Sequence, residues 1–128
     1  VAIARRNWPK IISLAWVITS GFDKPKRRSA ALIMILGSVE IPNVNVRMPQ
    51  GAFYFFPEVS AYYGKSYKDY TINNSTDLCM YLLYEANVAT VQGSAFGDDT
   101  CIRLSYATSE DVLVEAIRRI KEALANLK

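Results

Sequence analysis

The end of the chain carries an apolar stripe that a folded protein has to cover. The stripe consists of Leu113, Ala116, Ile117, Ile120, Leu124 and Leu127. These residues recur at the spacing of one helix face and charged side chains occupy the opposite face, which predicts an amphipathic helix. Thr108 and Asp111 predict a capping box at its start. Since the apolar face of such a helix needs an apolar partner, a second layer of structure must pack against it.

Residues 101–107 predict a strand directly before that helix. Successive side chains of a strand point to opposite faces, so Ile102 and Leu104 share one face with Tyr106. The other face then carries Arg103 among small residues. We therefore expect Arg103 to point away from the apolar side of its strand.

Apolar runs between turn residues predict the other elements. The predicted strands are 44–47, 52–56 and 88–91, and the predicted helices are 30–36, ending at Gly37, and a helix from Asn74 or Ser75 to Ala86. Asn87 is expected to form a left-handed cap, residues 60–71 a surface loop, and residues 53–56 part of the core. The result is an α/β class, an α+β two-layer sandwich, with the order helix-strand-strand-helix-strand-strand-helix.

Composition removes several kinds of chemistry. The chain has 128 residues, about one domain, and contains no histidine. The missing histidine excludes Ser-His and Cys-His nucleophile pairs, histidine-ligated zinc and histidine acid–base catalysis by this chain alone. Cys79 and Cys101 stand 22 positions apart with no Cys-x-x-Cys motif. We expect both thiols to be reduced and buried.

The charge is distributed unevenly along the chain. Residues 1–47 have a net charge of +6 and residues 48–128 a net charge of −3. We therefore divide the chain into a basic segment of helix and loop, residues 1–40, and a domain of residues 41–128. A second interpretation is that residues 1–40 come from a misread or altered coding frame.

Two features of the basic segment have alternative interpretations. Residues 11–18 are apolar behind Arg5 and Arg6, like a secretory leader, but a buried helix or strand is the prediction. The run is too short to span a bilayer. The basic cluster Lys24, Lys26, Arg27 and Arg28 could contact phosphates, but without interleaved aromatics it predicts a solvated helix start.

Three ordered strings match one family. They are Pro49-Gln-Gly-Ala-Phe-Tyr54, Gly93-Ser-Ala-Phe-Gly97 and Cys101-Ile-Arg-Leu-Ser-Tyr-Ala-Thr108 followed by the predicted helix. From about Glu40 to Lys128 the chain resembles the carboxy-terminal small domain of class I aminotransferases, an architecture of fold type I. It is most similar to the bacterial-type aspartate aminotransferases, a group that includes aspartate/prephenate aminotransferases.

The resemblance implies a role for this chain within a longer enzyme. Arg103 would bind the α-carboxylate of the substrate, and Gly93 and Gly97 would shape a loop beside it. The complete enzyme would be a cytoplasmic transferase of amino-acid metabolism, a homodimer that moves an amino group between aspartate and 2-oxoglutarate. Its partners would be amino-acid and 2-oxo-acid substrates and the rest of the chain, with no nucleic acid and no membrane.

The resemblance also implies the cofactor pyridoxal 5'-phosphate, which family enzymes hold on a lysine of the large domain. In the family this lysine lies in an S-K-type motif. No lysine of this sequence has that motif context; the lysines are Lys10, Lys24, Lys26, Lys65, Lys68, Lys121 and Lys128. We therefore expect no catalytic, cofactor-binding or metal-binding residue in this chain and no activity of the chain alone. The alternative is a stand-alone α/β module that binds a ligand or partner.

Overall fold

A three-stranded antiparallel sheet has β7 (Ile102–Ser105) as its central strand. The computed structural model describes residues 12–13, 24–47 and 54–128. Strand β2 (Tyr54–Phe55) pairs with one edge of β7, placing Tyr54 opposite Ser105. Strand β6 (Val91–Gln92) pairs with the other edge, placing Val91 opposite Arg103.

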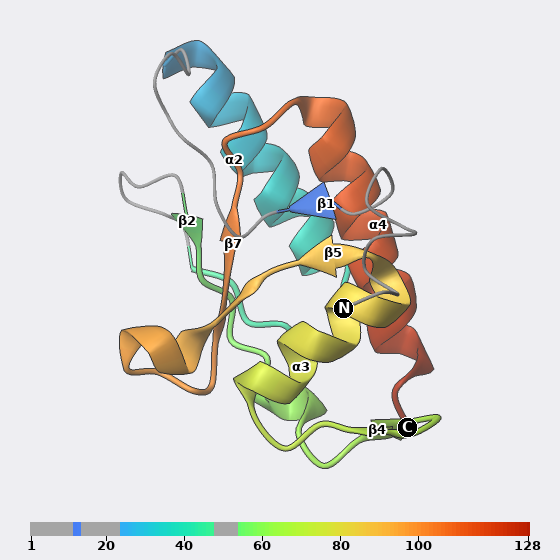
Figure 1. The fold of residues 1–128 in the computed structure, drawn as a ribbon. Coiled ribbons are helices and arrows are strands. Elements are labelled where there is room, and N and C mark those ends of the chain that lie inside the picture. The colour runs from blue at the N-terminus through green and yellow to red at the C-terminus, as the bar shows by residue number, and fades with distance from the viewer. Residues whose placement is uncertain (1–11, 14–23, 48–53) are drawn as a thin grey trace.

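Two helices cover one face of this sheet. Helix α2 (Lys24–Val39) and helix α4 (Glu110–Asn126) lie side by side (Figure 1). Met34 of α2 and Ile120 of α4 line a small apolar core cavity together with Ile102 and Leu104 of β7. The predicted stripe of α4 is confirmed, because its apolar residues are buried there. The helices and the sheet form the α/β arrangement that the sequence predicts.

The start of α4 differs from the prediction. The helix begins at Glu110, and its N-cap residue is Ser109, which makes no side-chain capping bond. The predicted capping box of Thr108 and Asp111 is therefore wrong. Glu110 and Asp111 lie in the first turn instead, where negative charge interacts favourably with the helix dipole.

The predicted end of the first helix is also wrong. Helix α2 continues through Gly37 to Val39. A Cβ atom on Gly37 would lie 2.7 Å from Cγ2 of Ile117, so this glycine allows α2 and α4 to approach closely. Gly37 is a packing residue rather than a terminator. The basic cluster does lie at the start of the helix, which begins at Lys24.

Helix α3 (Ser75–Tyr81) begins as predicted and ends in a different form. Asn74 is the N-cap, and its side chain accepts a hydrogen bond from the Asp77 amide at 2.9 Å. From Leu82 to Ala86 the helix widens into a π-helical turn, η3. Asn87 then adopts the predicted left-handed conformation, with φ of 54°.

Residues 60–71 are more ordered than the predicted surface loop. They form a 3-10 turn, η2 (Ser60–Tyr62), and a hairpin of β3 (Ser66–Tyr67) and β4 (Tyr70–Thr71). Tyr67 and Tyr70 pack edge-on against Tyr81. Ser66 exchanges two backbone hydrogen bonds with Lys128. The hairpin is thus held by tertiary contacts that its sequence does not display.

Two predicted strands are shorter than expected. The strand at 44–47 is reduced to a single bridge between Asn45 and Glu58. The strand at 88–91 is divided into β5 (Val88–Ala89) and β6, and β5 pairs in parallel with β1 (Ile12–Ser13). The predicted helix or strand at 11–18 is therefore a strand at Ile12–Ser13, and its other residues lie outside the described part.

The cysteines behave as predicted, since Cys79 and Cys101 are both buried free thiols. The helices in the described part of the chain are too short or too polar to cross a bilayer. The division of the chain at residue 40 stays a prediction.

Candidate functional site

Arg103 lies on the face of β7 opposite the core. Ile102 and Leu104 are 2% and 3% exposed on the core side, whereas Arg103 is half-buried on the other. The alternation of the strand therefore places a guanidinium where the sequence predicts it. Cys101, Ser105 and Ala107 are also buried, so Arg103 alone among the residues from 101 to 107 is partly open.

Two aromatic rings contact this guanidinium, and a third contacts one of them. The Cζ atom of Arg103 lies over the rings of Tyr54 and Phe96, 4.4 Å from each centroid. Phe56 contacts Phe96 edge-on, with the centroids 6.2 Å apart. The three rings are 38–50% exposed, an unusual position for aromatic side chains gathered in one place.

The prediction that residues 53–56 are core is only partly right. Phe55 is 1% exposed and belongs to the core. Tyr54 and Phe56 point to the opposite face, because side chains alternate along a strand, and they join the surroundings of Arg103. Phe53 lies outside the described residues.

Glycine shapes the loop that carries Phe96, as predicted. The loop contains a 3-10 turn, η4 (Gly93–Phe96), and ends at Gly97, whose φ is 83°. A Cβ atom on Gly93 would lie 2.1 Å from the carbonyl oxygen of Asp98 and 2.2 Å from that of Cys101. The Gly93 amide donates a hydrogen bond to the carbonyl oxygen of Cys101, and the Gly93 carbonyl oxygen accepts one from the Asp98 amide. The loop can close on itself only because Gly93 has no side chain.

A polar network ties this loop to the start of α3. Fully buried Ser75 donates its hydroxyl proton to the Asp99 carboxylate at 2.6 Å and accepts a bond from the Ser94 amide at 3.4 Å. The Tyr63 hydroxyl donates to the Asp99 carbonyl oxygen. Burial, followed by the charge of Asp99, raises the pKa of Tyr63, which keeps this donor protonated. Sequence reasoning missed Ser75 in this role, because its only visible feature was its ability to cap a helix.

The arrangement around Arg103 is suited to binding a carboxylate. A guanidinium is planar and permanently charged, and its N–H groups form a fork that matches two carboxylate oxygens. The aromatic rings exclude water from part of its surroundings, which strengthens an ionic hydrogen bond. Phe96 was not predicted as part of the site, since nothing in the spacing of residues 96 and 103 reveals their contact.

The described lysines do not complete a site for pyridoxal phosphate. Lys68 is ion-paired with Glu85 at 2.8 Å, and Lys121 with Glu40 at 3.0 Å. Lys65 lies over the ring of Tyr62. These three lysines contact other side chains, and none of these contacts involves Arg103, so these three lysines do not form a cofactor site with Arg103. In the same part of the chain, no group of three or more metal-ligating side chains is found.

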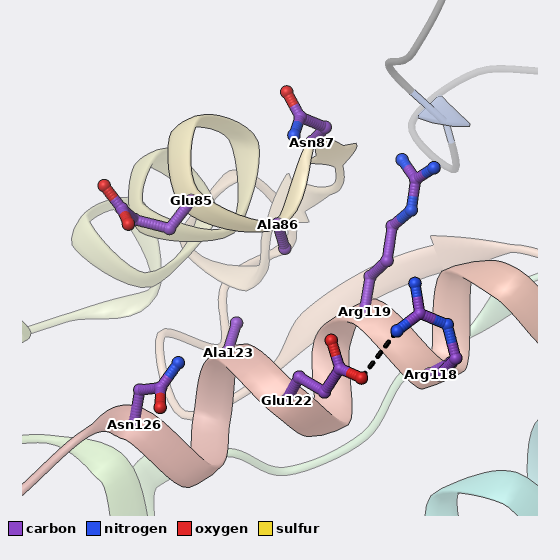
Figure 2. A pocket seen from close by; sticks show the side chains of 8 residues that line it. All are labelled: Glu85, Ala86, Asn87, Arg118, Arg119, Glu122, Ala123 and Asn126. Atoms are coloured by element: carbon purple, nitrogen blue, oxygen red, sulfur yellow. Dashed lines mark hydrogen bonds and ion pairs between the residues drawn. The ribbon is translucent and has the colours of Figure 1, made fainter.

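Apart from the surroundings of Arg103, a cleft lies between η3 and α4. It measures about 260 Å³ and contains the side chains drawn in Figure 2. Its Arg118 is paired with Glu115 and Glu122, and Arg119 is paired with Glu115, all on the same helix. The charges of this cleft are thus largely neutralised within α4, and Arg103 remains the stronger candidate site.

The sequences of related proteins align with most of this chain. It is 53% identical over 90 residues to a bifunctional aspartate aminotransferase and glutamate/aspartate-prephenate aminotransferase of Petunia hybrida, covering 70% of this chain and 19% of that protein. It is 45% identical over 104 residues to an aspartate aminotransferase of Pinus pinaster, covering 80% of this chain and 21% of that protein. The chain spans about a fifth of the length of these relatives.

A solved structure has the same fold. The crystal structure of the aspartate aminotransferase from Rhizobium meliloti superposes with a TM-score of 0.76 at 40% identity, covering 82% of this chain and 26% of that one. The family model "Aminotransferase class I and II" matches residues 23–120, well over half of the sequence. The chain therefore belongs to the class I and II aminotransferase family.

Proposed function

We propose that this chain is the carboxy-terminal small domain of a pyridoxal-phosphate-dependent aspartate aminotransferase. The complete enzyme moves an amino group between aspartate and 2-oxoglutarate. Arg103 binds the α-carboxylate that both substrates carry. The observation that carries the proposal is the position of Arg103, a half-buried residue on the face of β7 opposite the core, whose guanidinium lies over two aromatic rings.

Three considerations support this assignment. The family is that of class I and II aminotransferases, and the petunia and pine relatives are named for aspartate. Substrates of such an enzyme are small anions, and a guanidinium with in-plane donors recognises a carboxylate better than a lysine does. Arg103 also occupies the central strand, whose pairing with β2 and β6 fixes the position of its backbone.

The proposal includes parts that this chain does not supply. Pyridoxal phosphate supplies the electron-withdrawing group for amino transfer, and residues outside this chain bind it. The chain alone is therefore inactive. The complete enzyme acts in the cytoplasm as a homodimer, and its partners are amino-acid substrates, 2-oxo-acid substrates and the rest of its own polypeptide.

Substitution of Arg103 in the complete enzyme tests the proposal. Arg103→Ala removes a charge-assisted pair with the substrate, which should cost about 2–5 kcal/mol of transition-state stabilisation. The value of kcat/KM for aspartate should therefore fall by about 30-fold to several thousandfold. Arg103→Lys keeps the charge but loses the fork, and we expect an intermediate loss. Steady-state kinetics with both substrates provide the measurement. An unchanged kcat/KM for Arg103→Ala would overturn the assignment.

The intact mass of the source polypeptide separates this proposal from a stand-alone binding module. A polypeptide several times longer than 128 residues supports the aminotransferase. A mass of 14.4 kDa, with a folded monomer that does not respond to pyridoxal phosphate, supports the module instead. Peptide mapping of residues 1–40 would also reveal an altered coding frame.

A further inference from the structure

We infer that Phe96 is a positioning residue that holds the guanidinium of Arg103 in the orientation needed to bind a substrate carboxylate. This inference rests on the carboxylate-binding role proposed for Arg103. Phe96 itself does not touch the reacting atoms; it acts through the arginine. Tyr54 supplies a second ring to the same cation.

Phe96 and a substrate carboxylate would use different parts of the Arg103 guanidinium. The Cζ atom of Arg103 lies over the Phe96 ring at 4.4 Å from its centroid, within the range of a cation–π interaction. A ring interacts with the face of a guanidinium, whereas a carboxylate is bound by the N–H groups at its edge. Phe96 can therefore fix the cation without competing with the substrate for its donors.

Core packing does not account for the position of Phe96. Its side chain is 50% exposed, and Phe56, which contacts it, is 38% exposed. An apolar ring left half in water gains only part of the stabilisation that full burial would give. Its contacts with Arg103 and Phe56 are the interactions that distinguish this ring from an ordinary exposed side chain.

The loop that carries Phe96 is built to hold the ring in place. The Gly97 amide donates a hydrogen bond to the Ser94 carbonyl oxygen at 3.2 Å, which closes a turn that contains Phe96. Ser94 is in turn bonded to buried Ser75, which also binds Asp99. A loop fixed on both sides of residue 96 can determine the direction of one side chain, and the cost of ordering it is met during folding.

An ordered arginine lowers the entropy lost when the substrate binds. An arginine side chain has several rotatable bonds, and a binding site must restrict them before the fork meets both carboxylate oxygens. Loss of the Phe96 ring should therefore weaken the binding of any substrate that uses Arg103. Because both substrates carry the same α-carboxylate, the effect should be similar for aspartate and for 2-oxoglutarate.

The test uses the complete enzyme with Phe96→Leu, Phe96→Trp and, as the matched control, Tyr84→Leu. Tyr84 is a 43% exposed ring on η3 and is not part of the site. We expect Phe96→Leu to raise KM for both substrates and the Kd of maleate, a non-reacting dicarboxylate, by about 3- to 30-fold. The value of kcat should change by less than about twofold, since the chemical step does not use the ring. Phe96→Trp keeps an aromatic face and should restore the KM values, and Tyr84→Leu should leave them unchanged.

The results separate this inference from the function on which it rests. If Arg103→Ala abolishes efficient turnover while Phe96→Leu leaves every KM unchanged, the positioning role is wrong and the carboxylate role stands. A loss of thermal stability in Phe96→Leu without a rise in KM, not restored by tryptophan, identifies a structural role and also overturns the inference. If neither substitution affects turnover, the proposed function itself fails.

Discussion

Gly93 and Gly64 are required for different physical reasons. A Cβ atom on Gly93 would lie within 2.2 Å of two backbone carbonyl oxygens, and backbone cannot move aside as a flexible side chain can. A Cβ atom on Gly64 would meet no atom within 4 Å, but the φ of 86° lies in the left-handed region that other residues adopt at a cost. Gly93 is therefore required because its surroundings are crowded, and Gly64 because of its backbone conformation.

Alanine substitutions should distinguish these two causes. We expect Gly64→Ala to lower the free energy of unfolding by about 1 kcal/mol, the usual cost of a left-handed Cβ. Gly93→Ala should lower it by about 3 kcal/mol or more, since the loop must open to admit a methyl group. Urea unfolding monitored by circular dichroism gives both values. Equal losses for the two variants would mean that the loop relaxes around residue 93.

Local chemistry at single residues was predictable, and contacts across a loop were not. The cap at Asn74 and the left-handed Asn87 follow from the side chains themselves. The direction of Arg103 follows from the two-residue period of a strand. The Phe96 ring reaches Arg103 only because the loop between them folds back on Gly93, and no periodicity encodes that path.

Among the elements, α4 carries the strongest electrostatic feature. Glu115 binds Arg118 at 2.8 Å and Arg119 at 2.7 Å, one helical turn further along. Its bonds to Arg118 and then to Arg119 lower the pKa of Glu115 from 4.5 to about 2. The unfolded chain lacks these bonds and so binds a proton at Glu115 more readily than the folded helix does.

This difference sets the sign of a pH effect on stability. A lowered folded pKa contributes stability above about pH 4.5, and the contribution is lost as the pH falls towards 2. We expect Glu115→Gln to be less stable than the wild type at pH 7, and the gap to close between pH 4.5 and pH 2. Thermal unfolding across that range measures the gap. It should shrink in 1 M salt, because exposed charges are screened; a gap that is independent of both pH and salt would contradict the ionic explanation.

The elements differ in how much of them could be foreseen. The α4 stripe repeats over several turns, so its periodicity outweighs local detail. The β3–β4 hairpin has two residues in each strand and depends on Tyr67 and Tyr70 meeting Tyr81. The π-helical turn at Leu82–Ala86 also has an ordinary helical sequence. Such features arise from packing partners that are distant in the chain.

At the scale of the whole molecule, the helical layer depends on one close approach. Gly37 of α2 lies against Ile117 of α4, and a Cβ atom there would be 2.7 Å from Cγ2 and 2.8 Å from Cδ1 of that isoleucine. Alanine is otherwise about 1 kcal/mol better than glycine inside a helix. Helix propensity and overpacking oppose each other, so Ile117 decides whether Gly37→Ala stabilises or destabilises the protein.

A double-mutant cycle with Ile117→Ala should reverse the effect of Gly37→Ala on stability. We expect Gly37→Ala to destabilise the wild type by about 1 kcal/mol or more, since overpacking outweighs helix propensity. Ile117→Ala removes both crowding carbons, and in that background Gly37→Ala should stabilise by up to about 1 kcal/mol. Urea unfolding of the four proteins completes the cycle. Stabilisation by Gly37→Ala in both backgrounds would show that the helices separate freely.

The central place of β7 also has a consequence for timing. Backbone amides of a strand that is bonded along both edges exchange with solvent only when the sheet comes apart, whereas outer strands fray first. Since β7 lies between β2 and β6, Arg103 is attached to the slowest-opening backbone of this sheet. The rapid motions around its guanidinium are then those of side chains, on the scale of picoseconds to nanoseconds. A ligand arriving there meets an anchor that stays still for far longer than the encounter lasts.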